Sequence, residues 1–191
     1  MTYALMAQDV LQYMDDKNIE QAHLLGHSMG GKVAMTVALA YPARVKKLIV
    51  ADISPVTYPP HHHDIFKGLL SVDFKQEKSR AAVDSALAKY VENNGVRQFL
   101  LKNLQLEEDR GFRWRMNLAA IYANYESILQ GMTAQTSFNG EVLFIAGSLS
   151  DYIQSEYKDQ TLSLFPRTAL KIIPEATHWL HAEKPRIFIG I

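Results

Sequence analysis

A glycine-flanked serine separates an apolar run from an amphipathic pattern near the start of the chain. Residues 26–31 read Gly-His-Ser-Met-Gly-Gly. The apolar run at 22–26 predicts a short buried strand, and residues 30–41 predict a helix that Pro42 ends. A nucleophile on so sharp a turn needs a strained backbone and small neighbours. The pattern therefore predicts a strand-to-helix elbow with Ser28 at its tip.

The helix predicted after the elbow is placed to stabilise a negative charge next to the serine. Its first amides and the positive end of its dipole are expected to point at an oxyanion that forms next to the serine. The backbone N–H of Met29 is the natural first donor. A phosphate-binding loop fits poorly, because the chain has no G-x-x-x-x-G-K-[ST] pattern. We therefore expect Lys32 to be a solvent-facing residue of the first helical turn.

Three further apolar runs predict buried strands, at 47–51, 141–146 and 168–173. A helix is expected over residues 2–16, with Thr2 as its N-cap. Continuous apolar runs with helices between them are typical of a parallel sheet covered on both faces. The predicted fold class is therefore α/β.

The spacing of the predicted strands is uneven. About 90 residues separate the second strand from the third, far more than one crossover helix requires. Much of this stretch has helix-like apolar spacing. We expect a core of residues 1–55 and 140–191, and a helical cap inserted at 56–139 that lacks a sheet of its own.

Composition narrows the possible function classes. Hydrophobic residues make up 48% of the 191 residues, 20 basic residues balance 20 acidic ones, and cysteine is absent. A neutral chain has no global field to attract nucleic acid or an anionic membrane. Without cysteine there is no disulfide, thiolate metal site or cysteine nucleophile. With no signal peptide and no membrane-length apolar run, we expect a cytoplasmic protein.

A serine hydroxyl needs a histidine to accept its proton. His178 follows the last predicted strand, where a hydrolase with the chain order serine, acid, histidine carries its base. His181 is expected to be structural, and His27 is too close to the serine to present its ring as the base. The histidines at 61–63 are not expected to hold a metal, because adjacent loop residues rarely present three ligands to one ion without added carboxylates.

Two carboxylates could orient the histidine. Topology favours Asp151, because the loop after the third predicted strand usually supplies the acid. Asp52 ends the second predicted strand, next to the elbow strand, and could also reach the imidazole. Only one acid is needed, and the pattern of residues leaves both candidates open.

At this point the residues resemble a known family. The chain is similar to the α/β-hydrolase superfamily, and within it to the YbfF-type esterases and their mitochondrial ABHD-type relatives. The matching segments are residues 26–32, 52–56, 112–118 and 178–185. Relatives usually place a glycine directly before the histidine, where this chain has Thr177. The resemblance implies hydrolysis of acyl esters or thioesters without metal or organic cofactor. It also implies Asp52 as the acid, with Asp151 second.

The resemblance also sets an expectation about the ends of the chain. Such enzymes normally begin with several tens of further residues, including a His-Gly loop that supplies a second oxyanion donor. Nothing in this chain matches that loop, and its last residues stop short of a full final helix. We therefore expect a hydrolase truncated at its N-terminus, with the elbow strand as an exposed apolar edge.

The sequence thus predicts a serine esterase or thioesterase with Ser28, His178 and Asp52 as its catalytic residues and Met29 in the oxyanion hole. Its partner is a small-molecule acyl ester or thioester. The candidates for the acyl pocket are His27, Trp114, Tyr122 and Trp179. The two aromatic residues of the insertion could instead belong to its core. Two other functions stay open: a non-catalytic remnant, and an acyltransferase or C–C hydrolase.

Overall fold

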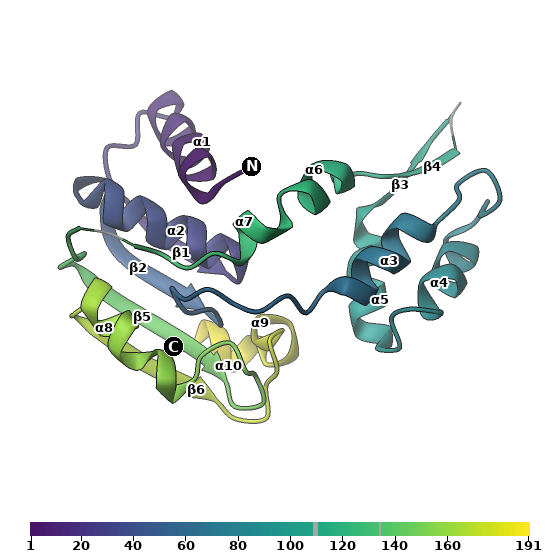
Figure 1. Ribbon diagram of the computed structural model, residues 1–191. Coiled ribbons are helices and arrows are strands. Elements are labelled where there is room, and N and C mark those ends of the chain that lie inside the picture. Colours follow the sequence, from purple (N-terminus) through teal and green to yellow (C-terminus); the bar gives the residue numbers. More distant parts are fainter. Residues whose placement is uncertain (109–110, 134) are drawn as a thin grey trace. The chain divides into compact units, whose positions relative to one another are not determined.

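The computed structural model describes residues 1–108, 111–133 and 135–191. The chain divides into two compact units, which Figure 1 shows as ribbons. The first unit joins Met1–Tyr58 to Ser127–Ile191, and the second is Pro59–Glu126. The division therefore falls a few residues after the expected start of the insertion, and well before its expected end at residue 139.

The first unit alternates strands and helices, as its sequence pattern predicts. The helices and strands in chain order are α1 (Tyr3–Asp16), β1 (Ala22–His27), α2 (Met29–Ala40), β2 (Val45–Ala51), α7 (Tyr125–Leu129, which begins in the second unit), β5 (Glu141–Gly147), α8 (Lys158–Leu164), β6 (Thr168–Ile173), α9 (Leu180–Glu183) and α10 (Pro185–Ile189). Short 3-10 turns lie at Pro42–Arg44 and Ser155–Tyr157. Thr2 caps α1, its hydroxyl accepting from the N–H of Leu5.

The four strands of the first unit form one parallel sheet in the order β1-β2-β5-β6. In the described part of the chain, β1 pairs with β2 alone, so the elbow strand is an edge of the sheet, as expected. Since parallel strands end at the same edge, the carboxyl ends of β1, β2 and β5 lie next to one another. Loops that follow these strands can therefore bring their side chains together.

The two faces of this sheet are covered unevenly. On one face, Leu48, Val50 and Phe144 are at most 2% exposed. Helix α2 packs on β1 and β2 at this face, and Phe165 at the end of α8 contacts Phe144. The opposite face is covered near its carboxyl end, where Ile145, Ile173, Ala176 and Leu180 form a buried cluster. On the edge strand β1, Leu25 is 56% exposed. Helices therefore flank the sheet on both faces, as expected, with α2 and α8 on one face and α9 on the other.

The second unit has its own apolar core. Its elements are α3 (His63–Ser71), α4 (Arg80–Ala88), α5 (Asn94–Leu100), a 3-10 turn (Leu101–Asn103), β3 (Leu104–Glu107), β4 (Gly111–Trp114) and α6 (Leu118–Ala123). Leucine and valine side chains from α3, α4, α5, the 3-10 turn and the segment between α4 and α5 form the buried cluster. Strands β3 and β4 pair antiparallel. The prediction of an insertion without a sheet was wrong, because strands of four residues carry too little alternation to stand out in the sequence.

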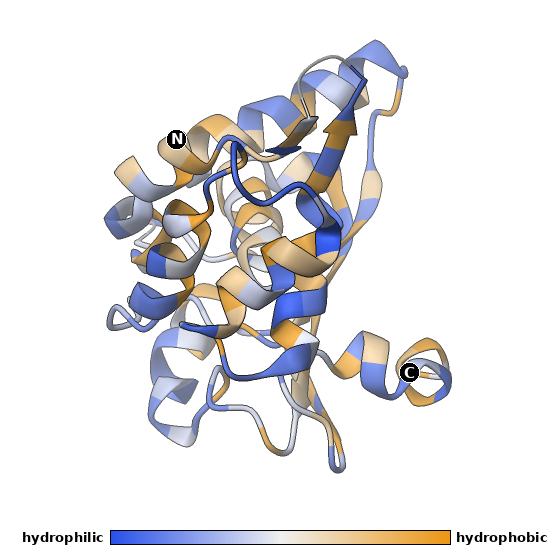
Figure 2. Cartoon of the chain, turned by 90° about the vertical axis from the view of Figure 1, so that its right-hand side faces the viewer, coloured by the Kyte–Doolittle hydropathy of each residue, from blue (hydrophilic) through white to orange (hydrophobic). Residues whose placement is uncertain are grey.

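Along several helices in Figure 2, hydrophilic and hydrophobic residues are interspersed. This is the pattern of helices with one buried side. Among the described residues, no helix is both long enough and apolar enough to cross a membrane.

Candidate active site

The elbow holds Ser28 in a backbone conformation that side-chain-bearing residues rarely adopt. Ser28 connects β1 to α2 with φ 54° and ψ −123°. Its N–H donates to the carbonyl of Ala51 at 3.0 Å, which fixes the turn to β2. A Cβ at position 26 would lie 2.2 Å from the carbonyl oxygen of Gly30, so the strand and the helix can approach only with glycine there. The predicted elbow geometry is present, although position 30 itself has room for a side chain.

A chain of hydrogen bonds runs from Ser28 through His178 to Asp52. The Nε2 atom of His178 lies 2.9 Å from the Ser28 Oγ, and its Nδ1 lies 2.8 Å from the Asp52 Oδ2. An ionised carboxylate can only accept, so Nδ1 carries the proton. The opposite nitrogen of the neutral ring is then free to accept the serine proton. The arrangement can therefore raise the nucleophilicity of the hydroxyl.

Asp52 is fully buried and every oxygen of its carboxylate is hydrogen-bonded. It directly follows β2, has φ 52°, and is 0% exposed. Its Oδ1 accepts from the N–H of Gly147 at 3.0 Å, and its Oδ2 accepts from the hydroxyl of Ser150 as well as from His178. A buried carboxylate is stable only with such partners. Ser150 was not predicted as a site residue, although it lies in the polar loop after β5 that was expected to face the site.

Asp151 occupies a different environment. It is exposed, and its Oδ1 accepts from the side-chain amide of Gln154 at 3.3 Å. The loop after β5 therefore presents Ser150, and not Asp151, to the carboxylate of Asp52. Of the two acids weighed from the sequence, the one that contacts His178 is Asp52.

The loop that carries His178 is fixed at two points. Thr177, the residue that stands where relatives usually have glycine, donates both its N–H and its hydroxyl to the carboxylate of Glu183. His27 lies 2.8 Å through its Nε2 from the carbonyl of His178, and a carbonyl can only accept. Burial lowers the pKa of His27 to about 4, so the ring is neutral near pH 7. His27 thus supports the backbone of the candidate base.

An aromatic ring lies against His178. The Tyr152 ring stacks on the imidazole with centroids 4.1 Å apart and an interplanar angle of 29°. The carbonyl of Tyr152 accepts from the Tyr58 hydroxyl, and from the Ser54 hydroxyl at 3.0 Å. These three residues were not among the candidates predicted from the sequence, because the hydrogen bonds of Tyr58 and Ser54 to Tyr152 span more than 90 positions.

The burial of Lys32 shows that one prediction from the sequence was wrong. It was expected to face solvent, yet it is 1% exposed and is the largest fully buried side chain among the described residues. Its ammonium lies among backbone carbonyls of Val56, Leu129 and Gln130. The sequence gives no local signal for this position, because its partners are 24 to 98 residues away.

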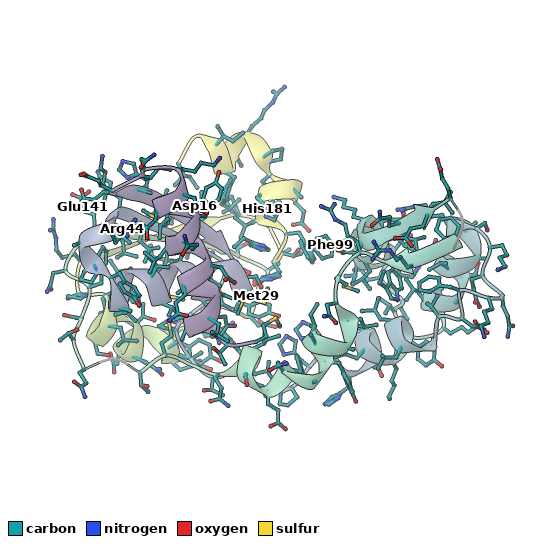
Figure 3. All side chains as sticks on the ribbon, turned by 90° about the horizontal axis from the view of Figure 1, so that it is seen from above. Asp16, Met29, Arg44, Phe99, Glu141 and His181 are labelled. Carbon is teal, nitrogen blue, oxygen red and sulfur yellow. The ribbon has the colours of Figure 1, made fainter. Side chains whose placement is uncertain are left out.

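The remaining candidates are distributed over both units. Met29 begins α2 and His181 lies in α9, and both are labelled in Figure 3. The Ser28 side chain does not cap α2, and the first N–H groups of a helix have no partner within it. The Trp179 ring lies 5.5 Å from that of His178 and 5.8 Å from that of His27.

Two candidates for the acyl pocket lie in the second unit. Trp114 donates its ring N–H to the carbonyl of Leu69 at 3.2 Å and packs against the core of that unit. This is the alternative foreseen for it, a place in the core. Tyr122 is 53% exposed and contacts Phe66 edge to face. A pocket role for these two residues stays a prediction.

Two histidines of the run at 61–63 contact other residues of the second unit. The Nδ1 of His61 donates to the carbonyl of Pro59, and the Nδ1 of His62 lies 2.9 Å from the Tyr125 hydroxyl. Over residues 1–108, 111–133 and 135–191, no group of three histidine or carboxylate side chains is arranged to hold a metal ion.

Comparison with known proteins adds the family. A sequence profile described as the alpha/beta hydrolase fold matches residues 1–185. The chain belongs to the α/β-hydrolase fold family. Its parallel sheet agrees with the fold that the resemblance implied, and the candidate residues Ser28, Asp52 and His178 follow one another along the chain in that order.

The similar proteins include esterases and lipases. An sn-1-specific diacylglycerol lipase ABHD11 of Danio rerio is 39% identical over 196 residues, covering 100% of this chain and 62% of that protein. Esterase YbfF of Escherichia coli is 35% identical over 186 residues, covering 97% of this chain and 71% of that protein. A solved marine microorganism esterase superposes with a TM-score of 0.96 at 40% identity, covering 100% of this chain and 76% of that one. The chain thus spans about three fifths of the length of the ABHD11 relative.

Proposed function

We propose that this chain is a serine hydrolase that cleaves carboxylic esters or thioesters through an acyl-enzyme intermediate. One observation carries the proposal: the continuous hydrogen-bonded chain from the Ser28 hydroxyl through His178 to the buried carboxylate of Asp52. The similarity to proteins named esterase and lipase supports the same class of reaction.

In the first half of the reaction, the Ser28 oxygen attacks the acyl carbon while its proton passes to Nε2 of His178. Asp52 keeps the ring in the tautomer that can accept this proton, and stabilises the imidazolium that forms. The backbone N–H of Met29, at the positive end of α2, hydrogen-bonds to the oxyanion. The intermediate collapses when the alkoxide or thiolate leaves with the proton from His178.

In the second half, water replaces the leaving group. His178 takes a proton from the water as its oxygen attacks the acyl-serine, and returns that proton to Ser28 when the acid leaves. The side chains and water account for every proton in this cycle, so the proposal requires no metal and no organic cofactor.

The substrate is proposed to be a small acyl ester or thioester. Trp179 and His27 lie next to the candidate base and would contact the acyl group near the reacting carbonyl. The prediction from the sequence that Trp114 and Tyr122 of the insertion at 56–139 line the acyl pocket is kept as part of this proposal. Apolar and aromatic surface of this kind suits an acyl chain.

Labelling with a fluorophosphonate probe tests the proposal. The probe should bond covalently to Ser28, and Ser28→Ala should abolish labelling and lower the rate of short p-nitrophenyl ester hydrolysis by at least about 10³-fold. Ser163→Ala, an exposed serine of α8, is the matched control and should label like the wild type.

Folded protein that is not labelled would contradict the proposal and favour a non-catalytic remnant. Turnover that appears only when an alcohol or thiol acceptor is added would favour an acyltransferase. An ester and a thioester with the same acyl group, compared at equal concentration, would then identify the preferred leaving group.

A further inference from the structure

Lys32 places a cation inside the first unit, in the first turn of α2 and four residues after Ser28. Its ammonium donates to the carbonyls of Val56 at 2.9 Å, Leu129 at 3.1 Å and Gln130 at 2.6 Å. An ammonium has three N–H donors, so all three are used. Within the part of the chain that the structure describes, no ion pair includes Lys32. Backbone carbonyls therefore take the place of a carboxylate partner.

The three carbonyls belong to two segments that we call the tether, Pro55–Tyr58 and Leu129–Met132. Along the chain, the first segment leads out of the first unit and the second follows its return. The segments are joined by three hydrogen bonds, from Tyr58 N–H to the Leu129 carbonyl, from Met132 N–H to the Pro55 carbonyl and from Gly131 N–H to the Thr57 hydroxyl. Lys32 thus binds both segments of the tether to the helix that begins at the elbow.

A second set of contacts leads from Lys32 to the candidate base. The ammonium lies 5.0 Å from the centre of the Tyr58 ring, within the range of a cation–π contact. The Tyr58 hydroxyl donates to the carbonyl of Tyr152, whose ring stacks on the imidazole of His178. One cation–π contact, one hydrogen bond and one ring stack thus connect Lys32 to the imidazole of His178.

We propose that Lys32 is a positioning residue for the hydrolase reaction: by holding the tether on α2, it fixes Tyr58 and Tyr152 and so the orientation of the His178 ring. This inference rests on the proposed function for its rate effects. A small displacement of a reacting group can cost about 10²-fold in rate, so a residue outside the site can matter this much.

Burial makes the charge of Lys32 depend on pH within a range that can be tested. It lowers the pKa of Lys32 to about 8, so the ammonium predominates below that pH and the neutral amine above it. The titratable rings that face Nζ among the described residues are those of Tyr3 and Tyr58, and burial raises the pKa of both phenols well above their usual range. A neutral amine has two N–H donors for three carbonyls, so the tether loosens as Lys32 loses its proton.

The test compares Lys32→Met, Tyr58→Phe and the double variant, with Lys46→Met on the exposed side of β2 as the control. The second-order rate of fluorophosphonate labelling is measured on protein shown to be folded by its thermal transition. Each single variant should label about 10-fold more slowly, and the double variant no more slowly than the slower single variant. The wild-type rate should fall above pH 8, whereas the Lys32→Met rate should not.

Three results would overturn the inference. The first is a wild-type labelling rate in Lys32→Met, with only the thermal midpoint lowered. The second is a double variant whose labelling rate is reduced by the product of the two single effects. The third is the same pH dependence of the labelling rate in the wild type and Lys32→Met. If Lys32→Met does not fold, wild-type labelling in Tyr58→Phe overturns it. If the wild type is not labelled at all, the proposed function fails. The ¹⁵N chemical shifts of the His178 ring then test the positioning role by themselves. A change of these shifts in both Lys32→Met and Tyr58→Phe supports positioning, and no change refutes it.

Discussion

The two units differ in what they bury. In the first, Lys32, Asp52 and Ser54 are buried polar or charged side chains, and the structure describes no other such residue. In the second, the buried cluster is made of leucine and valine, among them Val83 and Leu87. Buried polar groups destabilise a fold unless each is hydrogen-bonded, whereas apolar packing stabilises it directly. In the first unit each of these three side chains is hydrogen-bonded, and Asp52 accepts from the ring of His178.

If that contrast is correct, removing one buried charge from the first unit should affect chemistry most. We expect Asp52→Asn to lower kcat for ester hydrolysis by about 10⁴-fold, because the amide cannot hold His178 in the required tautomer. Asp151→Asn is the matched control and should stay close to the wild type, since Asp151 is exposed and contacts Gln154. Kinetics on short p-nitrophenyl esters measures both. If Asp151→Asn lowered kcat more than Asp52→Asn, the role of the acid would belong to Asp151.

A cavity in the second unit should affect stability and leave chemistry intact. Leu87 is 0% exposed, and Leu87→Ala should lower the free energy of unfolding by about 2–5 kcal/mol. Leu106→Ala, at a leucine that is 65% exposed, should have little effect. Denaturant unfolding gives both values. At low temperature, labelling of Ser28 in Leu87→Ala should stay within about twofold of the wild type. A tenfold slower labelling rate would contradict the contrast between the units, in which the apolar core of the second unit affects stability and not chemistry.

The smallest expected effect is on the pH dependence of stability, and it concerns His27 in the first unit. Burial lowers the pKa of His27 to about 4, while an unfolded histidine titrates near about 6.5. As the pH falls through this window, the unfolded chain binds a proton that the folded protein does not, so the free energy of unfolding falls. His27→Gln keeps a donor but cannot titrate.

Thermal midpoints between pH 7 and pH 4 measure this effect. The wild type should lose stability more steeply on acidification than His27→Gln, and His23→Gln on the exposed part of β1 is the control. Parallel curves for the wild type and His27→Gln would show that this ring takes up its proton equally well in both states.

Much of the sheet could be predicted because its signals are local. Apolar runs gave the four strands of the first unit to within two residues, and β6 (168–173) agrees at both ends. The glycine-flanked serine gave the elbow. These features depend on neighbours in sequence, which a pattern can record. The short strands β3 and β4 were missed because four residues carry too little alternation.

The support of the site depends on distant residues. Ser150 reaches Asp52 across 98 positions, and Lys32 reaches Gln130 across the same number. No local pattern distinguishes a buried lysine with three carbonyl partners from a surface lysine at the first turn of a helix. The residues with chemical character were therefore the ones that could be predicted from the sequence, whereas contacts between distant residues, such as Ser150 with Asp52, were visible only in the structure.

The hydrogen bond between Ser28 and Ala51 has a consequence for how activity is lost on heating. The N–H of Ser28, the residue directly after β1, donates to the carbonyl of Ala51, the last residue of β2, and Asp52 follows Ala51 in the chain. The nucleophile and the candidate acid are therefore held by the same pair of neighbouring strands. Separation of β1 from β2 would displace Ser28 from Asp52 and His178, so loss of labelling on heating should coincide with loss of this pairing, as measured by hydrogen exchange of the β1 amides.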